Sequence, residues 1–235
     1  MVTSSRVAII PARGGSKRIE KKNIVNFCGK PMIAWTIAAA QKSEMFERIV
    51  VSTDDPEIAD VARQYGASVP FLRKQHSDDL APVGLATIGT LLQLRDELGK
   101  EYETVVQLMA NCPLRDAHHI VDALDHFERH GANSQISCFK FGWMNPWWAV
   151  TISEDCKPHS LFPEASKSRS QDLPPLYCPT GAIWIAKVAH LIKHQTFSTQ
   201  DHIFWTMPWE AAVDIDDRED LRMAELLHLM GNRTS

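Results

Sequence analysis

Features that define several large protein classes are absent from this chain of 235 residues. No run of 18 apolar residues is present, and the first residues lack the apolar core and cleavage site of a signal peptide. The five cysteines form no CxxC pair, so neither a disulfide framework nor a zinc site is indicated. We therefore expect a cytoplasmic protein without a membrane partner.

Two common phosphate-binding motifs are also missing. The chain contains neither GxxxxGK[ST] nor GxGxxG. These glycine-rich patterns are typical of P-loop proteins and of dinucleotide-binding Rossmann domains. Any nucleotide site must therefore be built from a different loop.

The net charge of -4 is unevenly distributed along the chain. Residues 1–42 contain eight lysines and arginines and a single acid, Glu20. Basic residues crowded into so few turns suit a compact polyanion such as a nucleoside triphosphate better than duplex nucleic acid. No nucleic-acid partner is expected, and from charge alone a solvated basic loop explains this segment equally well.

Strand-like and helix-like segments alternate along most of the chain. Short apolar runs are separated by longer segments of helix formers, and three of these segments end at a glycine (Gly66, Gly99 and Gly131). This order predicts an α/β fold with a mostly parallel central sheet and helices on both faces. We expect strands at 6–10, 48–52, 68–72, 104–109, 135–139, 182–187 and 211–215, and helices at 31–43, 56–65, 85–98, 117–130 and 218–229.

The alternation breaks between residues 142 and 179. This stretch is rich in proline and holds Trp143, Trp147 and Trp148, which is typical of an inserted arm rather than of a separate domain. We therefore divide the chain into an α/β core (1–140), an arm (141–180) and a return to the core with the C-terminal helix (181–235).

A basic glycine loop, PARGGSKR (11–18), follows the first predicted strand directly. Ligands of open α/β sheets collect beyond the carboxyl ends of the strands. Gly14 and Gly15 permit positive φ, so that backbone N–H groups can converge on a phosphate, and Arg13 can bind phosphate oxygens in bidentate fashion. The alternative is an ordinary turn, but the position after the first strand favours a phosphate site.

Two aspartates lie two residues apart near the end of the chain. Asp214 and Asp216 would project from the same face of the last predicted strand. Two such carboxylates can hold Mg²⁺, which usually takes one or two carboxylates together with phosphate oxygens. By spacing alone, a solvated strand end explains the pair at least as well. Asp217 and Asp220, by contrast, have the spacing of a helix cap.

Seven motifs, in order along the chain, resemble those of the acylneuraminate cytidylyltransferases. The first is VAIIPARGGSKRIEKKNI at 7–24, which continues into GKPMI at 29–33. The others are VSTD with EIA (51–59), FLR (71–73), CPLR (112–115), RSQDLP (169–174), GAI (181–183) and VDID (213–216). The family includes enzymes for sialic, legionaminic and pseudaminic acids, and the resemblance implies a Rossmann-like nucleotidyltransferase fold with a small dimerisation insertion.

The same resemblance implies a cytidylyltransferase that transfers CMP from CTP to a nine-carbon acidic sugar, with Mg²⁺ as cofactor. It implies that Asp214 and Asp216 hold the metal and that Arg13, Lys22 and Asp216 are catalytic. The residues that it implies for binding the nucleotide are Arg13, Gly14, Gly15, Ser16, Lys22, Asn23 and, at the cytosine, Arg73.

The sugar-binding residues implied by the resemblance lie in separate segments. They are Met109, Arg169, Gln171, Thr180 and Trp184, and Trp184 could equally pack in the core. An arginine in this set is chemically reasonable, because a guanidinium pairs with the carboxylate of such sugars. Because the family is dimeric with an arm in this region, we expect a homodimer with the aromatic segment 141–148 at the contact.

Several positions depart from the pattern of the sialic acid enzymes. Met109 stands where those enzymes have a sugar-contacting glutamine, and Asn111 replaces a nearby threonine. Cys178 and Thr180 stand where many relatives have Arg and Asn. Exchanging hydrogen-bonding groups changes which substituents fit, so these positions favour a nonulosonic acid other than N-acetylneuraminate.

Further departures lie near the nucleotide. Glu20 stands where the opening motif commonly has proline. Pro82 and Val83 lie in a stretch after Ser77 where relatives often place a hydroxyl near the base. Cytosine selectivity would then depend on Arg73 and on backbone groups.

Two other functions stay open at this point. One is an enzyme with another nucleotide or sugar, including a glycosyltransferase that uses Asp214 and Asp216 as its metal motif. The other is a non-catalytic nucleotide-binding protein, which the altered pocket residues would favour. The RSQD segment (169–172) argues against the first, and the intact Arg13 and Lys22 with both aspartates argue against the second.

Overall fold

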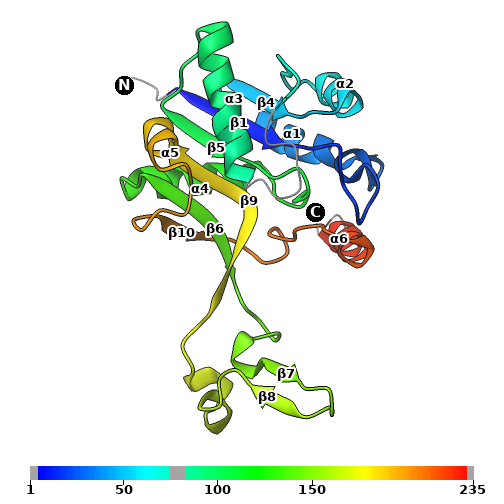
Figure 1. Cartoon of the computed structure of the whole chain (residues 1–235), viewed down its shortest axis with the longest axis vertical. Coiled ribbons are helices and arrows are strands. Elements are labelled where there is room, and N and C mark those ends of the chain that lie inside the picture. Colours follow the sequence, from blue (N-terminus) through cyan, green and yellow to red (C-terminus); the bar gives the residue numbers. More distant parts are fainter. Residues whose placement is uncertain (1–4, 75–82, 232–235) are drawn as a thin grey trace.

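The computed structural model describes residues 5–74 and 83–231, with a six-stranded sheet at the centre (Figure 1). The sheet has the order β10-β6-β9-β5-β1-β4. β1 pairs in parallel with β4 and β5, β10 pairs in parallel with β6, and β9 runs antiparallel between β5 and β6. The strands are β1 (Arg6–Pro11), β4 (Arg48–Ser52), β5 (Thr104–Gln107), β6 (Ser134–Lys140), β9 (Tyr177–Lys187) and β10 (Ile203–Thr206). The predicted α/β class with a mostly parallel sheet is confirmed.

Helices cover both faces of this sheet (Figure 1). In β1, Ala8 and Ile10 belong to one core and Val7 and Ile9 to the other, because successive side chains of a strand point to opposite faces. One layer holds α1 (Met32–Ser43), α2 (Pro56–Gln64) and α4 (Ala117–Arg129), and the other holds α3 (Val83–Leu98) and α5 (Val188–His194). No helix in the described part of the chain is long and apolar enough to cross a membrane.

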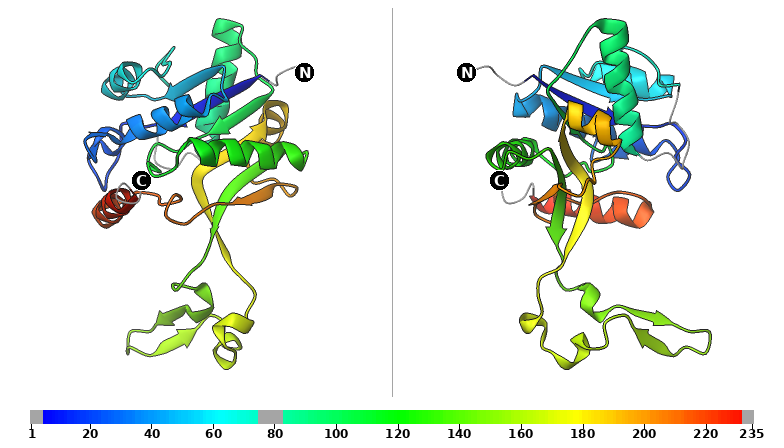
Figure 2. Two further views of the ribbon diagram at one scale, coloured as in Figure 1. Left: turned by 180° about the vertical axis from the view of Figure 1, so that it is seen from behind. Right: turned by 60° about the vertical axis from the view of Figure 1, so that its left-hand side comes forward.

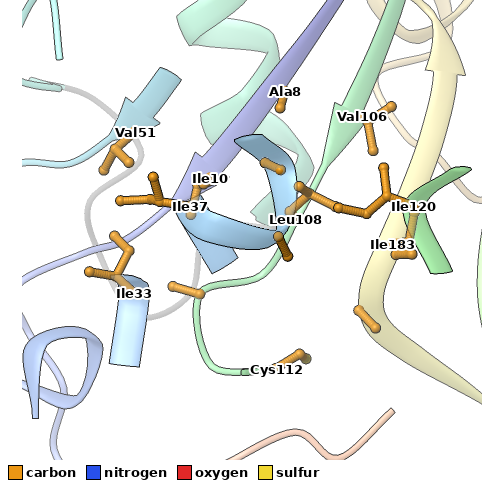
Figure 3. Close-up of a cluster of buried hydrophobic side chains, with 14 of the residues drawn as sticks. Ala8, Ile10, Ile33, Ile37, Val51, Val106, Leu108, Cys112, Ile120 and Ile183 are labelled. Carbon is orange, nitrogen blue, oxygen red and sulfur yellow. The ribbon is translucent and has the colours of Figure 1, made fainter. Parts of the chain in front are cut away.

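The larger core lies between the sheet and the layer of α1, α2 and α4. Figure 3 shows Ile37 of α1 and Ile120 of α4 together with Ile10 and Val106 of the strands. All four side chains are buried. Burying a side chain of this size contributes about 1.5–3 kcal/mol each, so this core holds the ends of β1 and β5 in fixed positions.

The last helix, α6 (Arg218–Gly231), packs against the segment that follows β1 rather than against the sheet. Ile19 and Phe27 of that segment share a buried cluster with Ile215 and Ala224. The segment also contains the 3₁₀ turn η1 (Lys22–Ile24) and the short pair β2 (Asn26–Phe27) and β3 (Lys30–Pro31). This packing brings the segment after β1 and the last helix together.

The N-terminus of α6 carries the predicted cap. The Asp217 carboxylate accepts from the backbone N–H groups of Glu219 and Asp220, at 2.8 and 3.0 Å. In return, the Asp220 carboxylate accepts from the N–H groups of Asp216 and Asp217, at 2.9 and 3.1 Å. The cap therefore holds the backbone of Asp216 in place.

An arm extends from the sheet between β6 and β9 (Figures 1 and 2). It contains an antiparallel pair, β7 (Val150–Ile152) and β8 (Pro158–Ser160), and the 3₁₀ turns η2 (Pro146–Trp148), η3 (Ala165–Lys167) and η4 (Ser170–Asp172). β9 begins at Tyr177, so the sheet resumes slightly before the predicted boundary at 181.

Two of the predicted strands are wrong. Residues 68–72 form an isolated parallel bridge between Val50 and Ser68 and no strand, since Pro70 lacks the N–H that a ladder needs. Residues 211–215 begin as a turn, in which Ala211 and Ala212 donate to the carbonyls of residues 208 and 209, and continue as irregular chain.

One strand of the central sheet, β10, was not predicted, and neither were the short strands outside it. β10 has only four residues and lies at the edge of the sheet, where Phe204 is exposed. Its short sequence, IFWT, carries neither a long apolar run nor a clear alternation. Only pairing with β6 makes this segment a strand.

Candidate active site

A cavity of about 460 Å³ opens at the carboxyl end of β1. Segments from far apart in the sequence meet there: the loop after β1, the beginning of α3, the loop after β5 and the chain before α6. Its lining residues are Pro11, Arg13, Ser16, Lys17, Arg18, Ile19, Lys22, Asn23, Arg73, Val83, Ala86, Met109, Asn111, Asp214 and Asp216. A basic loop and a pair of aspartates thus face one space.

The glycine loop is shaped by close contact and not by left-handed backbone. Neither Gly14 nor Gly15 has a positive φ, so the prediction that they supply this conformation is wrong. The N–H of Gly14 donates to Oδ1 of Asp54 at 3.0 Å, and glycine is needed there because a Cβ would lie 2.6 Å from Oδ2 of Asp55. Around Gly15 there is open space.

Asn23 stabilises the same loop from the inside. The buried Asn23 amide donates to the carbonyl of Arg13 at 2.9 Å, across ten residues of sequence. This bond folds the loop back on itself. Four of the residues that the sequence predicted at the nucleotide line one cavity: Arg13, Ser16, Lys22 and Asn23.

Asp216 accepts a cation on each of its carboxylate oxygens. Oδ1 lies 2.8 Å from Nζ of Lys22, and Oδ2 lies 2.6 Å from Nη2 of Arg18. Burial raises the pKa of Asp216, but these two partners outweigh burial and hold the pKa below its ordinary value. Lys22 also donates to the carbonyl of Ile215 at 2.8 Å, so it joins the loop after β1 to the chain before α6.

Asp214 lies beside Asp216 in a different environment. Its carboxylate accepts a hydrogen bond from the amide of Asn111, which also donates to the carbonyl of Ile215 at 3.1 Å. Asp214 is exposed as a residue, but desolvation of its carboxyl, and next the charge of Asp216, raise its pKa to about 6. The predicted strand at 211–215 does not form, and the two aspartates are instead aligned by Asn111 and by the cap of α6.

The two aspartates fit a divalent cation. Both carboxylates line one cavity, and after burial the charge of Asp216 is the next cause that raises the pKa of Asp214. No group of three or more His, Cys, Asp or Glu in residues 5–74 and 83–231 is placed to hold a metal ion. An ion at the two aspartates would therefore need further ligands from a substrate, as Mg²⁺ commonly does.

Arg73 is a buried cation in the cavity wall. Its Nη1 donates to the carbonyl and the hydroxyl of Ser52 at 3.0 and 3.2 Å, and burial lowers the pKa of its guanidinium. Its Nε has no hydrogen-bond partner among the described residues. Val83 and Ala86 of α3 line the same cavity. Ser77 and Pro82, which the sequence placed near the base, lie outside the described residues.

Met109 is the one predicted sugar-binding residue that lines the cavity in this chain. It packs against Gly181, where a Cβ would lie 2.8 Å from Cγ of Met109. Thr180 is buried and donates its hydroxyl to the carbonyl of Ala212 at 3.0 Å. Trp184 donates to the carbonyl of Thr180 at 2.8 Å and packs on the ring of Phe197, so it contributes to the core.

Arg169 and Gln171 lie on the arm and not at this cavity. Both are exposed, and Nε of Arg169 donates to Oδ2 of Asp172 at 2.8 Å. The arm that carries them extends away from the sheet in both views of Figure 2. Within one chain, the structure therefore does not bring them to the other predicted site residues.

Three polar residues of the cavity were not among the predicted binding residues. Lys17 and Arg18 belong to the basic loop, and their charge was the signal available in the sequence. Asn111 was noted only as a departure from the family pattern. Its role comes from a contact with Asp214 across 103 positions, which no local pattern reveals.

The fold and this cavity define an α/β nucleotidyltransferase. Residues 7–156 match the family described as cytidylyltransferase, and the chain belongs to this family. Pseudaminic acid cytidylyltransferase from Campylobacter jejuni is 34% identical over 231 residues, which are 97% of this chain and 98% of that protein. CMP-N,N'-diacetyllegionaminic acid synthase from Legionella pneumophila is 35% identical over 232 residues, with 94% and 95% coverage.

A solved structure shows the same fold. The chain resembles CMP:2-keto-3-deoxy-manno-octonic acid synthetase complexed with CTP, with a TM-score of 0.70 over 98% of this chain and 100% of the other. The two sequences are 16% identical, so this likeness concerns the fold alone.

Proposed function

We propose that this enzyme transfers CMP from CTP to the anomeric hydroxyl of a nonulosonic acid, with release of pyrophosphate. The observation that carries the proposal is the pairing of Lys22 with Asp216, which sets a basic loop directly opposite two carboxylates in one cavity. The relatives named for pseudaminic and legionaminic acids support the sugar class. Membership of the family supports CTP as donor.

In the proposed reaction, the basic loop binds the triphosphate. Arg13, Lys17 and Lys22 place positive charge around the phosphates, and the hydroxyl of Ser16 is available to donate to a phosphate oxygen. The oxygen of the sugar hydroxyl forms a bond to the α-phosphorus and its proton is released to solvent. The bond from the α-phosphorus to the oxygen that bridges to the β-phosphate breaks, and pyrophosphate leaves. Positioning and charge neutralisation supply most of such catalysis, since the protein forms no covalent bond.

Asp214 and Asp216 are the residues that would hold Mg²⁺. Mg²⁺ bound there would neutralise charge that builds on the phosphates and would lower the pKa of the attacking hydroxyl. Asn111 orients Asp214, and the cap of α6 orients Asp216. Both carboxylates must be ionised for this role.

Arg73 is proposed to face the cytosine. Its two bonds to Ser52 fix the guanidinium, and its Nε has no partner among the described residues. A buried guanidinium in this position favours a base that presents acceptors, because an unsatisfied donor is costly. Cytosine presents acceptors at its carbonyl oxygen and ring nitrogen.

The acceptor is proposed to be a nonulosonic acid other than N-acetylneuraminate. Met109 presents an apolar thioether to the cavity, and Thr180 uses its hydroxyl inside the protein. Sugar substituents near Met109 would therefore be accepted for their shape more than for hydrogen bonds. We expect a sugar of the pseudaminic or legionaminic type at the part of the cavity wall that Met109 forms.

A homodimer with exchanged arms would complete the sugar site. The arm exposes large apolar side chains, with Trp143 88%, Ile152 73% and Met144 67% exposed, and monomers rarely expose such patches. It also carries Arg169 and Gln171 away from the cavity of its own chain. In a dimer, the arm of one subunit would bring this arginine to the sugar carboxylate bound by the other. A cytoplasmic location, where CTP is made, accompanies this proposal.

Pyrophosphate release with CTP and Mg²⁺ tests the function. The acceptor panel contains N-acetylneuraminic, legionaminic, pseudaminic and 3-deoxy-octulosonic acids. We expect turnover with one of the first three and the highest kcat/KM with legionaminic or pseudaminic acid. A thermal-shift panel is the companion measurement, in which CTP should stabilise the protein far more than UTP or ATP. Equal stabilisation by all three nucleotides would contradict CTP as the donor.

A further inference from the structure

The two cations on Asp216 are held very differently. Lys22 is mostly buried, with 16% of its side chain exposed, and it donates both to Oδ1 of Asp216 and to the carbonyl of Ile215. Arg18 has 64% of its side chain exposed, and its Nη2 donates to Oδ2 of Asp216 at 2.6 Å. Lys22 is thus a fixed partner, whereas Arg18 is a surface partner.

Exposed ion pairs are weak, because water screens the attraction and two long side chains must give up conformational freedom. Arg18 can therefore leave Oδ2 of Asp216 with only a small loss of free energy. Lys22 cannot leave as easily, since its departure would remove a partner from both a carboxylate and a carbonyl. Of the two oxygens of Asp216, Oδ2 is the one that can become available to another cation.

A divalent cation and Arg18 compete for the same oxygen. Mg²⁺ needs carboxylate lone pairs, and a guanidinium that occupies one also repels the ion by its charge. Arg18 in addition lines the cavity in which Arg13 and Lys17 surround the proposed triphosphate. Phosphate oxygens in that space would attract a guanidinium more strongly than one exposed carboxylate does.

We propose that Arg18 is an exchangeable counter-ion: it pairs with Oδ2 of Asp216 until the triphosphate binds, and then moves to the phosphates and gives that oxygen to the metal. This inference rests on the function proposed above. It assigns Arg18 a positioning role, and it makes the binding of nucleotide and metal mutually favourable. Linkage requires this coupling to be equal in both directions.

The test compares Arg18→Gln with Lys17→Gln. Both substitutions remove one positive charge from the same cavity, but Arg18 is the residue bonded to Asp216. Free Mn²⁺ is measured by electron paramagnetic resonance, with and without CTP, and CTP binding is measured by calorimetry in EDTA. We expect Arg18→Gln to bind Mn²⁺ about tenfold more tightly than the unmodified enzyme without CTP, and to bind CTP about tenfold more weakly.

In Arg18→Gln, the affinity for Mn²⁺ should rise while the affinity for CTP falls. Damage to the fold would lower both affinities, so the opposite changes distinguish this role from damage. Lys17→Gln should weaken CTP binding but change the Mn²⁺ affinity by about twofold or less, because exposed charges are screened by salt. Arg18→Lys, which can still pair with a carboxylate, should restore values near those of the unmodified enzyme. The coupling between Mn²⁺ and CTP should be smallest in Arg18→Gln.

Equal Mn²⁺ affinities in Arg18→Gln and Lys17→Gln would overturn the role of Arg18. A weaker Mn²⁺ affinity in Arg18→Gln would do the same. Failure of the unmodified enzyme to bind CTP is a separate outcome, and it would overturn the proposed function itself. The control measurement on the unmodified enzyme therefore separates the two failures.

Discussion

Nζ of Lys22 lies 2.8 Å from Oδ1 of Asp216, although the two residues are 194 positions apart in the sequence. This ion pair joins the loop after the first strand to the chain before the last helix. Each residue alone has an ordinary explanation, as a basic loop residue or as an acid at a helix start. Their contact joins the two segments into a single site, which the sequence alone does not show.

Replacing Asp216 by asparagine should abolish pyrophosphate release. The substitution removes a proposed metal ligand, and metal stabilisation of the transition state is worth several kcal/mol, so kcat should fall by about 10³-fold or more. The variant should still fold, but its Tm at neutral pH should fall, because Lys22 and Arg18 hold the pKa of Asp216 below its ordinary value in the folded state. Asp60→Asn on the exposed side of α2 is the control, and it should keep full activity. Near-normal turnover of Asp216→Asn with Mg²⁺ present would rule out this metal ligand.

Replacing Asp214 by asparagine should make the protein more stable at neutral pH. The pKa of Asp214 is raised to about 6 from 3.8, so the folded state favours the protonated carboxyl. The protonated carboxyl of Asp214 therefore contributes to the free energy of unfolding. This contribution is fully present below about pH 4 and is lost as the pH rises through about 6. Asparagine mimics the protonated form at every pH.

Melting curves between pH 4 and 8 check this prediction. Asp214→Asn should match the unmodified protein at pH 4 and exceed its Tm above pH 6, while losing catalysis. Asp201→Asn is a control of opposite sign, because hydrogen bonds from Thr199 and Asn133 lower the pKa of Asp201 to about 2. That variant should lose stability at neutral pH. A Tm difference at Asp214 that is constant with pH would contradict the raised pKa.

The glycines at 14 and 15 should respond differently to alanine. A Cβ at Gly14 would lie 2.9 Å from Cβ of Asp55, which cannot move easily, whereas nothing lies within 4 Å at Gly15. Gly14→Ala should cost about 1–3 kcal/mol of stability and weaken CTP binding, as overpacking does. Gly15→Ala should change stability by less than about 0.5 kcal/mol. Chemical denaturation and CTP titration of both variants compare the two, and equal effects would contradict the contact argument.

Gly181 should resist substitution because Met109 packs against it. A Cβ there would lie 2.8 Å from Cγ of Met109 and 3.6 Å from Oδ2 of Asp214. Gly181→Ala should raise the KM for the sugar about tenfold or more by displacing Met109. Adding Met109→Ala should recover much of the thermal stability, because it removes the clash. If the double variant is less stable than either single variant, the clash is not the cause.

Complementation between two inactive variants tests the exchanged arms. Asp216→Asn keeps an intact arm, and Arg169→Ala keeps intact metal ligands. In a random mixture, half of the dimers contain both kinds of subunit, and one of their two sites is complete, so about a quarter of full activity should appear. Each variant alone should be inactive. If Arg169 acts on its own subunit, no activity will appear on mixing.

Much of the fold could be predicted from local patterns. β1 and β4 match their predicted ranges within a residue, and Gly66, Gly99 and Gly131 all have positive φ after the helices that they were predicted to end. The wrong strand at 68–72 contains a proline, and the missed strand β10 has only four residues. These are the segments in which pairing with a neighbour, and not local composition, decides the structure.

The sequence by itself determined the α/β class, the basic loop, the acidic pair and the family, because periodicity and short motifs are local properties of the chain. Only the tertiary structure decided that Lys22 and Asn111 hold the two aspartates, that Thr180 and Trp184 face inward, and that Arg169 lies on an arm away from its own cavity. These outcomes depend on contacts between residues far apart in the sequence. Such contacts form only when burial of the core brings the loop after β1 and the chain before α6 together.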